Sequence, residues 1–178
     1  MTHAADFSFR SARLQDAESV FNITKASIGG LARASYSPGQ IENWMGERTP
    51  SFYEELIGNG RMMVCLRGGV VVGFVDALPG ELTRLFILPE VAGVGLGRRL
   101  LKIGIAQSRL GHSGSIKLEA TVNAVGFYRK CGFRSKARGY FSHGRGGEPI
   151  EIVHMELWIP KFATRDASAL YGPICWIF

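Results

Sequence analysis

The sequence predicts a mixed α/β (α+β) fold with a mostly antiparallel central sheet of six to seven strands, flanked by about four helices. Apolar runs of strand length are separated by Gly-Gly and Pro-Gly breaks, which is typical of consecutive antiparallel strands. One apolar run leads through a glycine-rich turn into a basic helix, and another strand-like run follows, as in a βαβ unit. At 178 residues the chain has the length of one domain. We expect a single domain over 1–178, with a core at about 7–158 and a C-terminal tail at 161–178.

The first part of the chain predicts one strand and three helices. Apolar and polar residues alternate at the start, and apolar residues then recur at helical spacing. We expect Gly29-Gly30 to end the first helix, and Pro38 to lie in the first turn of the second. The predicted elements are a strand at about 7–13 and helices at about 15–28, 38–44 and 52–57.

Three strands are predicted next, at 61–67, 70–78 and 82–88. The Gly68-Gly69 pair between the first two is a signal for a two-residue hairpin turn. Pro79-Gly80 breaks the chain again before the third strand. Pro89 ends that strand because proline cannot donate to a sheet ladder.

The second half of the chain predicts a crossover followed by a hairpin. A basic amphipathic helix from about 95 to 110 leads to a strand at 115–120, which would lie parallel to the strand before the helix. We expect Asn123 to open a short helix that ends at Gly132. Two last strands, at 133–141 and 149–158, would form the closing hairpin.

Charge and composition narrow the possible partners. The formal charge of +6 favours anionic ligands. Basic residues cluster between 98 and 138, beside the glycine turn, which favours a small polyanionic cofactor over nucleic acid. No apolar run reaches the ~18 residues that span a bilayer, and the first twenty residues lack the apolar core of a secretory signal. We therefore expect no nucleic-acid or membrane partner and a cytoplasmic location.

The cysteines and histidines predict neither a metal site nor a disulfide framework. The three cysteines are far apart, and the four histidines match no metal-binding spacing. We therefore expect these residues to be ordinary packed or surface residues.

The glycine turn at 93–97 predicts a seat for an anion. Its alternating glycines let the backbone bend sharply and approach a ligand. Unpaired N–H groups and the positive end of the dipole at the start of the following helix attract phosphate. A Walker A loop is excluded because no Gly-Lys-Ser/Thr follows. A dinucleotide fingerprint is disfavoured because Arg98 stands where its third glycine belongs.

Two motifs together resemble the GNAT superfamily of acyl-CoA-dependent N-acetyltransferases. The segment 85–101 (LFILPEVAGVGLGRRLL) resembles the cofactor motif Q/R-x-x-G-x-G/A, which maps onto 92–97. The segment 123–133 (NAVGFYRKCGF) resembles the closing motif N-A-x-x-F-Y-x-x-x-G-F. The resemblance implies a GNAT fold with a splayed parallel pair of central strands. It departs from the family at Ala92, where Gln or Arg would add a contact to the pyrophosphate.

The resemblance further implies acetyl-CoA as co-substrate. The glycine turn would take the pyrophosphate, with Arg98 or Arg99 adding charge, and the strand before it would pair with the pantetheine arm. An N–H near Ile87 or Leu88 would polarise the thioester carbonyl, and Asn123 would cap its helix and contact the arm. The implied cofactor-binding residues are Phe86, Ile87, Leu88, Ala92, Gly93, Val94, Gly95, Leu96, Gly97, Arg98, Asn123 and Tyr128.

The implied reaction is transfer of an acetyl group to a primary amine of a small molecule or peptide, by direct attack in a ternary complex. Tyr128 occupies the family's general-acid position, near the thiolate. A carboxylate would take the amine proton, and the candidates are Asp76, Glu81 and Glu119. We place Glu81 first because it starts the cofactor strand.

The acceptor site is expected between the first two helices and the hairpin near 142–147. Its candidate residues are Tyr36 and Glu119, with Trp44 and Phe141 as further aromatic candidates. The main alternative is a non-catalytic acyl-CoA-binding or regulatory module on the same fold, against which the intact Tyr128 argues. The apolar tail, ending in Cys175 and three further residues, predicts a buried or intersubunit edge and hence a homodimer.

Overall fold

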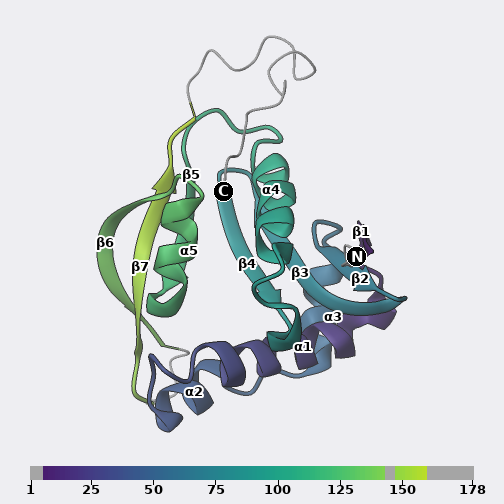
Figure 1. The fold of residues 1–178 in the computed structure, drawn as a ribbon, viewed down its shortest axis with the longest axis horizontal. Coiled ribbons are helices and arrows are strands. Elements are labelled where there is room, and N and C mark those ends of the chain that lie inside the picture. Colours follow the sequence, from purple (N-terminus) through teal and green to yellow (C-terminus); the bar gives the residue numbers. More distant parts are fainter. Residues whose placement is uncertain (1–5, 143–146, 160–178) are drawn as a thin grey trace.

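The computed structural model describes residues 6–142 and 147–159, and the predicted tail at 161–178 lies outside them. Its sheet has seven strands in the order β1-β2-β3-β4-β5-β7-β6 (Figure 1). Every neighbouring pair is antiparallel except β4–β5, which is parallel. The predicted fold class is confirmed. The five α-helices correspond to the five helical ranges predicted along the chain, one more than the overall estimate of about four. The strands are β1 (Phe7–Ser11), β2 (Met63–Arg67), β3 (Val70–Leu78), β4 (Glu81–Ile87), β5 (Ile116–Thr121), β6 (Arg134–Phe141) and β7 (Ile150–Leu157).

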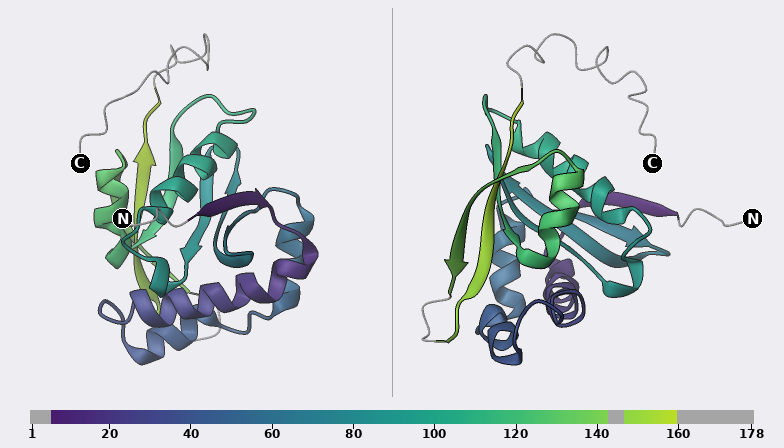
Figure 2. Two further views of the ribbon diagram at one scale, coloured as in Figure 1. Left: turned by 45° about the vertical axis from the view of Figure 1, so that its right-hand side comes forward. Right: turned by 60° about the vertical axis from the view of Figure 1, so that its left-hand side comes forward.

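Helices cover the two faces of the sheet unequally (Figures 1 and 2). On one face, Leu100 of α4 packs in a core with Val75 of β3 and Leu118 of β5. On the other, Ile23 of α1 packs with Phe74 of β3. We call these the α4 face and the α1 face. The helices are α1 (Ala17–Leu31), α2 (Pro38–Met45), α3 (Pro50–Gly58), α4 (Leu96–Ser108) and α5 (Val125–Lys130).

The first helix does not end at its glycine pair, as the sequence suggested. α1 continues through Gly29-Gly30 to Leu31. A Cβ at position 30 would lie 2.7 Å from Cγ of Pro89, which follows β4. Gly30 therefore serves a close approach rather than a helix end, and it lets α1 cross directly over the turn that leads into α4.

The predicted two-residue hairpin between β2 and β3 is confirmed. Arg67 and Val70 are register partners on either side of the turn. The residues between them, Gly68 and Gly69, have φ of +58° and +82°, which residues other than glycine rarely adopt.

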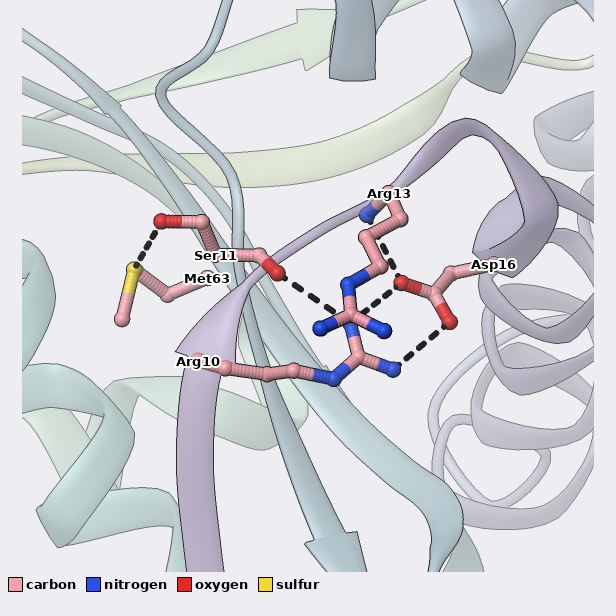
Figure 3. A network of polar contacts seen from close by, with 5 residues as sticks. All are labelled: Arg10, Ser11, Arg13, Asp16 and Met63. Atoms are coloured by element: carbon pink, nitrogen blue, oxygen red, sulfur yellow. Dashed lines mark hydrogen bonds and ion pairs between the residues drawn. The ribbon is translucent and has the colours of Figure 1, made fainter.

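A polar network ties β1 to the start of α1, as Figure 3 shows. The Asp16 carboxylate accepts two hydrogen bonds from the Arg10 guanidinium, at 2.6 and 3.0 Å, and one from the Arg13 N–H at 2.8 Å. Asp16 is only 5% exposed. The hydrogen bonds from Arg10 lower the pKa of Asp16, against the effect of burial. The network thus fixes how the chain passes from the sheet onto the helix.

We expect Asp16→Asn to lower the free energy of unfolding by about 1–3 kcal/mol at pH 7, because it weakens charge-assisted hydrogen bonds in a buried place. Since the folded pKa of Asp16 is depressed, its contribution is complete above the ordinary value of about 3.9 and is lost as the pH falls through the folded pKa. The difference between wild type and variant should therefore be constant above about pH 5 and shrink below pH ~4. Urea titrations across this range measure it.

The exposed Glu54 of α3 provides the control. Glu54→Gln should change the free energy of unfolding by no more than ~0.5 kcal/mol. A difference between wild type and the Asp16 variant that persisted undiminished at pH 2.5 would mean that the carboxylate charge contributes nothing.

Candidate active site

The central feature is the separation of β4 from β5. These two strands share only two register pairs, Glu81 with Lys117 and Leu82 with Leu118. Just beyond, a bulge interrupts the pairing of β4 with β3, and Thr83 is the extra residue. The strands then part toward their carboxyl ends, so the β5-facing edge of β4 has no sheet partner beyond Leu82 within the described residues.

The direction of the β4 amides follows from one hydrogen bond. The Leu88 N–H donates to the Val72 carbonyl at 2.9 Å, so it points toward β3. In an antiparallel ladder consecutive residues point their amides to opposite sides. Leu85 and Ile87 therefore direct their backbone groups into the opening. Of the two amides proposed to polarise a thioester, Ile87's faces the opening and Leu88's is already used within the sheet.

The turn after β4 leads into a helix whose first amides are uncapped. Gly93 and Gly95 have φ of +80° and +85°. Gly95 is the N-cap of α4, with no side-chain cap and no acidic residue in the first turn. The first helical hydrogen bond runs from Arg99 N–H to Gly95 O at 3.3 Å, so the three amides between these residues have no partner within the helix. These amides lie where the sequence predicts a seat for an anion.

The other turn residues contribute main chain rather than side chains. Leu96 is 1% exposed, so only its backbone is available to a ligand. Val94 is exposed at the tip of the turn. Ala92 N–H donates to Pro89 O at 3.1 Å and closes a short 3-10 turn. That hydrogen bond braces the loop through main chain at the position where the family has Gln or Arg.

The two arginines that follow the turn have different surroundings. The Arg99 guanidinium lies 5.6 Å from the ring centre of Phe7 and 4.8 Å from that of Phe9, so it packs on β1. Arg98 is exposed at the start of α4 and interacts with Cys131 at the end of α5. Burial raises the pKa of the Cys131 thiol, and Arg98 opposes this rise. Arg98 is therefore the arginine placed to add charge beside the turn.

A cavity of about 160 Å³ begins at this turn and reaches α1 and α2. A Cβ at position 97 would lie 3.4 Å from the Phe127 ring, so glycine lets α4 and α5 approach across the cavity. The cavity thus runs along the open edge of β4. It is lined by Ser27, Ile28, Leu31, Ala32, Trp44, Leu85, Phe86, Ile87, Gly97, Asn123, Ala124 and Phe127.

A larger cavity of about 440 Å³ lies on the other side of α5, between that helix and β6. Valines form part of its lining, together with Arg129, Lys136 and Arg138. None of the turn residues or open-edge residues of β4 lines it. Its size therefore does not make it the active-site cavity.

Asn123 does not cap α5, contrary to the expectation from sequence. The N-cap of α5 is Ala124, and no side chain caps the helix. The Asn123 amide instead donates to the Leu31 carbonyl at 3.3 Å. It therefore ties the end of β5 to the end of α1 at the wall of the cavity. It does not cap α5 because it lies within the 3-10 turn Val122–Ala124, which leads directly into that helix.

Tyr128 does not line this cavity, but it packs against Phe127, which does. It is 8% exposed, and its ring centre lies 5.0 Å from that of Phe127 and 5.7 Å from that of Phe133. It shares a core with residues of β4, α4 and β5. Burial raises the pKa of Tyr128, so its phenol stays protonated at neutral pH and can donate a hydrogen bond.

The three candidate carboxylates lie in different places. Asp76 is 2% exposed, and its Oδ2 accepts from the Thr83 hydroxyl at 2.8 Å and from Arg84 at 3.0 Å. Its Oδ1 is buried without a partner among the described residues. Glu81 is exposed at the first residue of β4, where β4 and β5 are still paired. It thus lies at the closed end of the strand pair, away from the opening.

Glu119 lies at the opening itself. It follows Leu118, the last β5 residue paired with β4. Leu118 and Ala120 are buried on the α4 face, so alternation along the strand places Glu119 on the α1 face. Its Oε1 lies 3.6 Å from Nδ1 of His154. From the sequence, His154 was expected to be an ordinary packed or surface residue.

Tyr36 is a brace rather than a free lining residue. It is 7% exposed, its hydroxyl donates to the Glu151 carbonyl at 2.6 Å, and it accepts from the Val122 N–H at 2.9 Å. These bonds join β5 to β7. Its ring packs against Trp44, which lines the cavity and also lies near Phe86. Phe141 is half-buried in the same cluster.

Residues 6–142 and 147–159 lack two other kinds of feature. No group of three or more His, Cys, Asp or Glu side chains that could hold a metal occurs there. No helix in these ranges has the length and apolar character needed to cross a membrane.

Comparison with known proteins gives a consistent family result. Residues 32–157 match the model of a family described as acetyltransferase (GNAT) domain. A GCN5-related N-acetyltransferase from Rhodopseudomonas palustris aligns with a TM-score of 0.75 at 23% identity, over 85% of this chain and 95% of that one. No protein of curated function matches the chain in sequence.

Two further similar structures were solved with ligands. The PaiA N-acetyltransferase of Thermoplasma acidophilum, in complex with coenzyme A, has a TM-score of 0.67 at 21% identity, over 86% of this chain and 99% of that one. The protein yncA of Salmonella typhimurium, with its cofactor acetyl-CoA, has a TM-score of 0.66 at 17% identity, over 91% and 99%. At these identities the similarity establishes the fold.

Proposed function

Because the chain belongs to the GNAT acetyltransferase family, we propose that it transfers an acetyl group from acetyl-CoA to a primary amine of a small molecule or peptide, by direct attack in a ternary complex. One observation carries this proposal: β4 and β5 part beyond Leu82, and the uncapped start of α4 lies at the open end. An uncapped helix start binds phosphate, and an open strand edge binds an amide-containing chain.

The cofactor would lie along the open edge of β4. Its pyrophosphate would accept hydrogen bonds from the first amides of α4, with Arg98 beside it. Its pantetheine amides would pair with the backbone groups of Leu85 and Ile87. Four residues separate Ile87 from Thr83, or about 13 Å of strand. The arm would therefore bring the thioester close to the bulge, where the strands rejoin.

The acceptor would approach from the α1 face. Its neutral nitrogen attacks the thioester carbonyl carbon, and the C–N bond forms as the carbonyl pair moves onto oxygen. The Leu85 N–H, which faces the opening and lies closer to the bulge than the Ile87 N–H, would stabilise that oxyanion. The C–S bond then breaks with its electron pair on sulfur, and the nitrogen loses one proton to a base.

Tyr128 would donate its phenol hydrogen to the leaving thiolate. Burial raises the pKa of Tyr128, which makes a free phenolate costly. The same apolar surroundings disfavour a bare thiolate, so a hydrogen bond from the protonated phenol would favour its formation. The hydrogen bond stabilises the thiolate as it forms.

Of the three carboxylates, Glu119 is best placed to take the amine proton. It stands on the acceptor side of the opening, one residue beyond the last β4–β5 pair. Glu81 lies at the closed end, and Asp76 is committed to Thr83 and Arg84. We therefore assign the base role to Glu119 rather than to Glu81, which the sequence had favoured.

A thiol-release assay tests the proposal. Acetyl-CoA is offered with five classes of amine, namely arylalkylamines, polyamines, amino acids, aminoglycosides and peptide N-termini, and acetylated product is identified by mass. Turnover of at least one class supports acetyl transfer. Tight binding of acetyl-CoA without turnover on any class would instead favour a non-catalytic acyl-CoA-binding module.

A further inference from the structure

A carboxylate–imidazole pair lies beside the opening between β4 and β5. Glu119 and His154 are register partners on β5 and β7, with Oε1 and Nδ1 3.6 Å apart. Both side chains are about half exposed, at 52% and 46%. The pair begins one residue after Leu118, where the pairing with β4 stops. It is therefore level with the bulge toward which the thioester would be carried.

Both side chains face the acceptor side of the sheet. Ile152, two residues before His154, packs with Ile28 of α1 and Trp44 of α2. Residues two apart on a strand share a face, so His154 belongs to the α1 face. Its partner Glu119 is on the same face, because register partners in an antiparallel pair point the same way.

The His154 ring projects from β7, which lies between β5 and the edge strand β6. A Cβ at position 139 of β6 would lie 2.6 Å from His154 Nε2, so the ring occupies the space that Gly139 leaves empty. Nδ1 is directed to Glu119, and Nε2 lies over β6. Since β6 is the last strand of the sheet, the second nitrogen lies on the side away from the opening.

We propose that Glu119 and His154 form a proton relay that carries the acceptor's proton from the opening to water at the β6 edge. This inference rests on the proposed acetyl transfer. As the nitrogen bonds to the carbonyl carbon, its proton passes to Glu119. The protonated carboxyl passes it to Nδ1 of a neutral His154, and Nε2 releases its own proton to water. The Tyr128 hydrogen bond stabilises the thiolate separately, and the thiolate takes up one proton from water as CoA leaves. That proton balances the one released at the β6 edge.

The charged neighbours of the Glu119–His154 pair are carboxylates, lysines and arginines. Glu156, beside them, is held ionised because the Ser115 hydroxyl and Lys136 lower its pKa. The groups on this face are Lys117 on β5, Glu156 on β7, Arg134 and Lys136 on β6, and Asp76 and Arg84 across the opening.

The test measures kcat at pH ~7.5 with saturating acetyl-CoA and the fastest amine of the five classes above. His154→Gln should lower kcat about tenfold, and Glu119→Gln should lower it about 100-fold. Because exposed ion pairs add little to stability, both variants should keep the wild-type unfolding midpoint.

Two further variants distinguish a role of His154 in proton transfer from a purely structural role. His154→Ala should regain activity in proportion to added imidazole, which a structural role would not produce. Gly139→Ala retains the histidine but displaces its ring, so it should lower kcat in the manner of His154→Gln. Lys117→Gln, on the same face of β5, is the matched control and should stay within twofold of wild type.

The outcomes distinguish the relay from the proposed function. An active wild type whose His154→Ala variant is unaffected, or is impaired but not restored by imidazole, overturns the relay alone. A wild type that turns over none of the amines overturns the acetyl transfer and the relay with it.

Discussion

Tyr128→Phe is expected to lower kcat about 100-fold, within the range that general acid catalysis contributes, while the KM for acetyl-CoA stays within about twofold. The phenol is buried, its pKa is raised, and its ring packs against Phe127, which lines the cavity that would hold the thioester arm. Phenylalanine retains the ring contacts with Phe127 and Phe133 and removes only the hydrogen-bond donor. Steady-state kinetics with a thiol-detecting reagent measures both constants.

The control for this variant is Tyr140→Phe. Tyr140 is on β6 and 74% exposed, so the loss of its hydroxyl should leave kcat unchanged. Pre-steady-state kinetics must show that chemistry limits turnover. If it does and Tyr128→Phe still turns over at the wild-type rate, Tyr128 has no part in the chemical step.

Gly95→Ala is expected to weaken acetyl-CoA binding at least tenfold. Gly95 is the N-cap of α4 with φ of +85°, a conformation that costs an L-residue about 1–2 kcal/mol. No protein atom would meet the added Cβ within 4 Å. The loop would therefore relieve the strain by leaving this conformation. The amides at the start of α4 would then no longer point toward the pyrophosphate. Calorimetric titration with acetyl-CoA and urea unfolding measure the two effects.

Gly58→Ala is the matched control, since a Cβ at that α3 position also meets nothing and φ there is not positive. It should leave binding unchanged and stability unchanged or slightly higher. If Gly95→Ala bound acetyl-CoA as tightly as wild type, the left-handed cap would not be what holds the pyrophosphate.

Much of the fold could be predicted from short-range signals. The Gly68-Gly69 hairpin, the Ser37 cap with Pro38 and the end of β4 at Pro89 are each determined by local backbone chemistry. The predicted helix end at Gly29-Gly30 was wrong, because a glycine can mark either the end of a helix or a place where another segment packs closely against it. The contact with Pro89 is made by a residue almost sixty positions away, which local signals do not contain.

The site was predicted less completely, because side-chain roles depend on partners that are distant in sequence. Tyr36 was expected to line the acceptor site, and it braces β5 to β7 instead. Asn123 was expected to cap α5, and it bonds to Leu31. No role was predicted for His154, because only the pairing register of β5 with β7 places it beside Glu119.

By itself, the sequence determined the glycine turn, the uncapped basic helix after it and the motif around Tyr128, because each depends on residues within one turn or strand. Only the tertiary structure decided where β4 and β5 separate, which β4 amides face the opening and which carboxylate stands beside it. These features depend on strand register and on the bulge at Thr83, where a shift of one residue reverses the face of every side chain that follows. The glycine turn could therefore be recognised in the sequence, whereas the Glu119–His154 pair required the folded sheet.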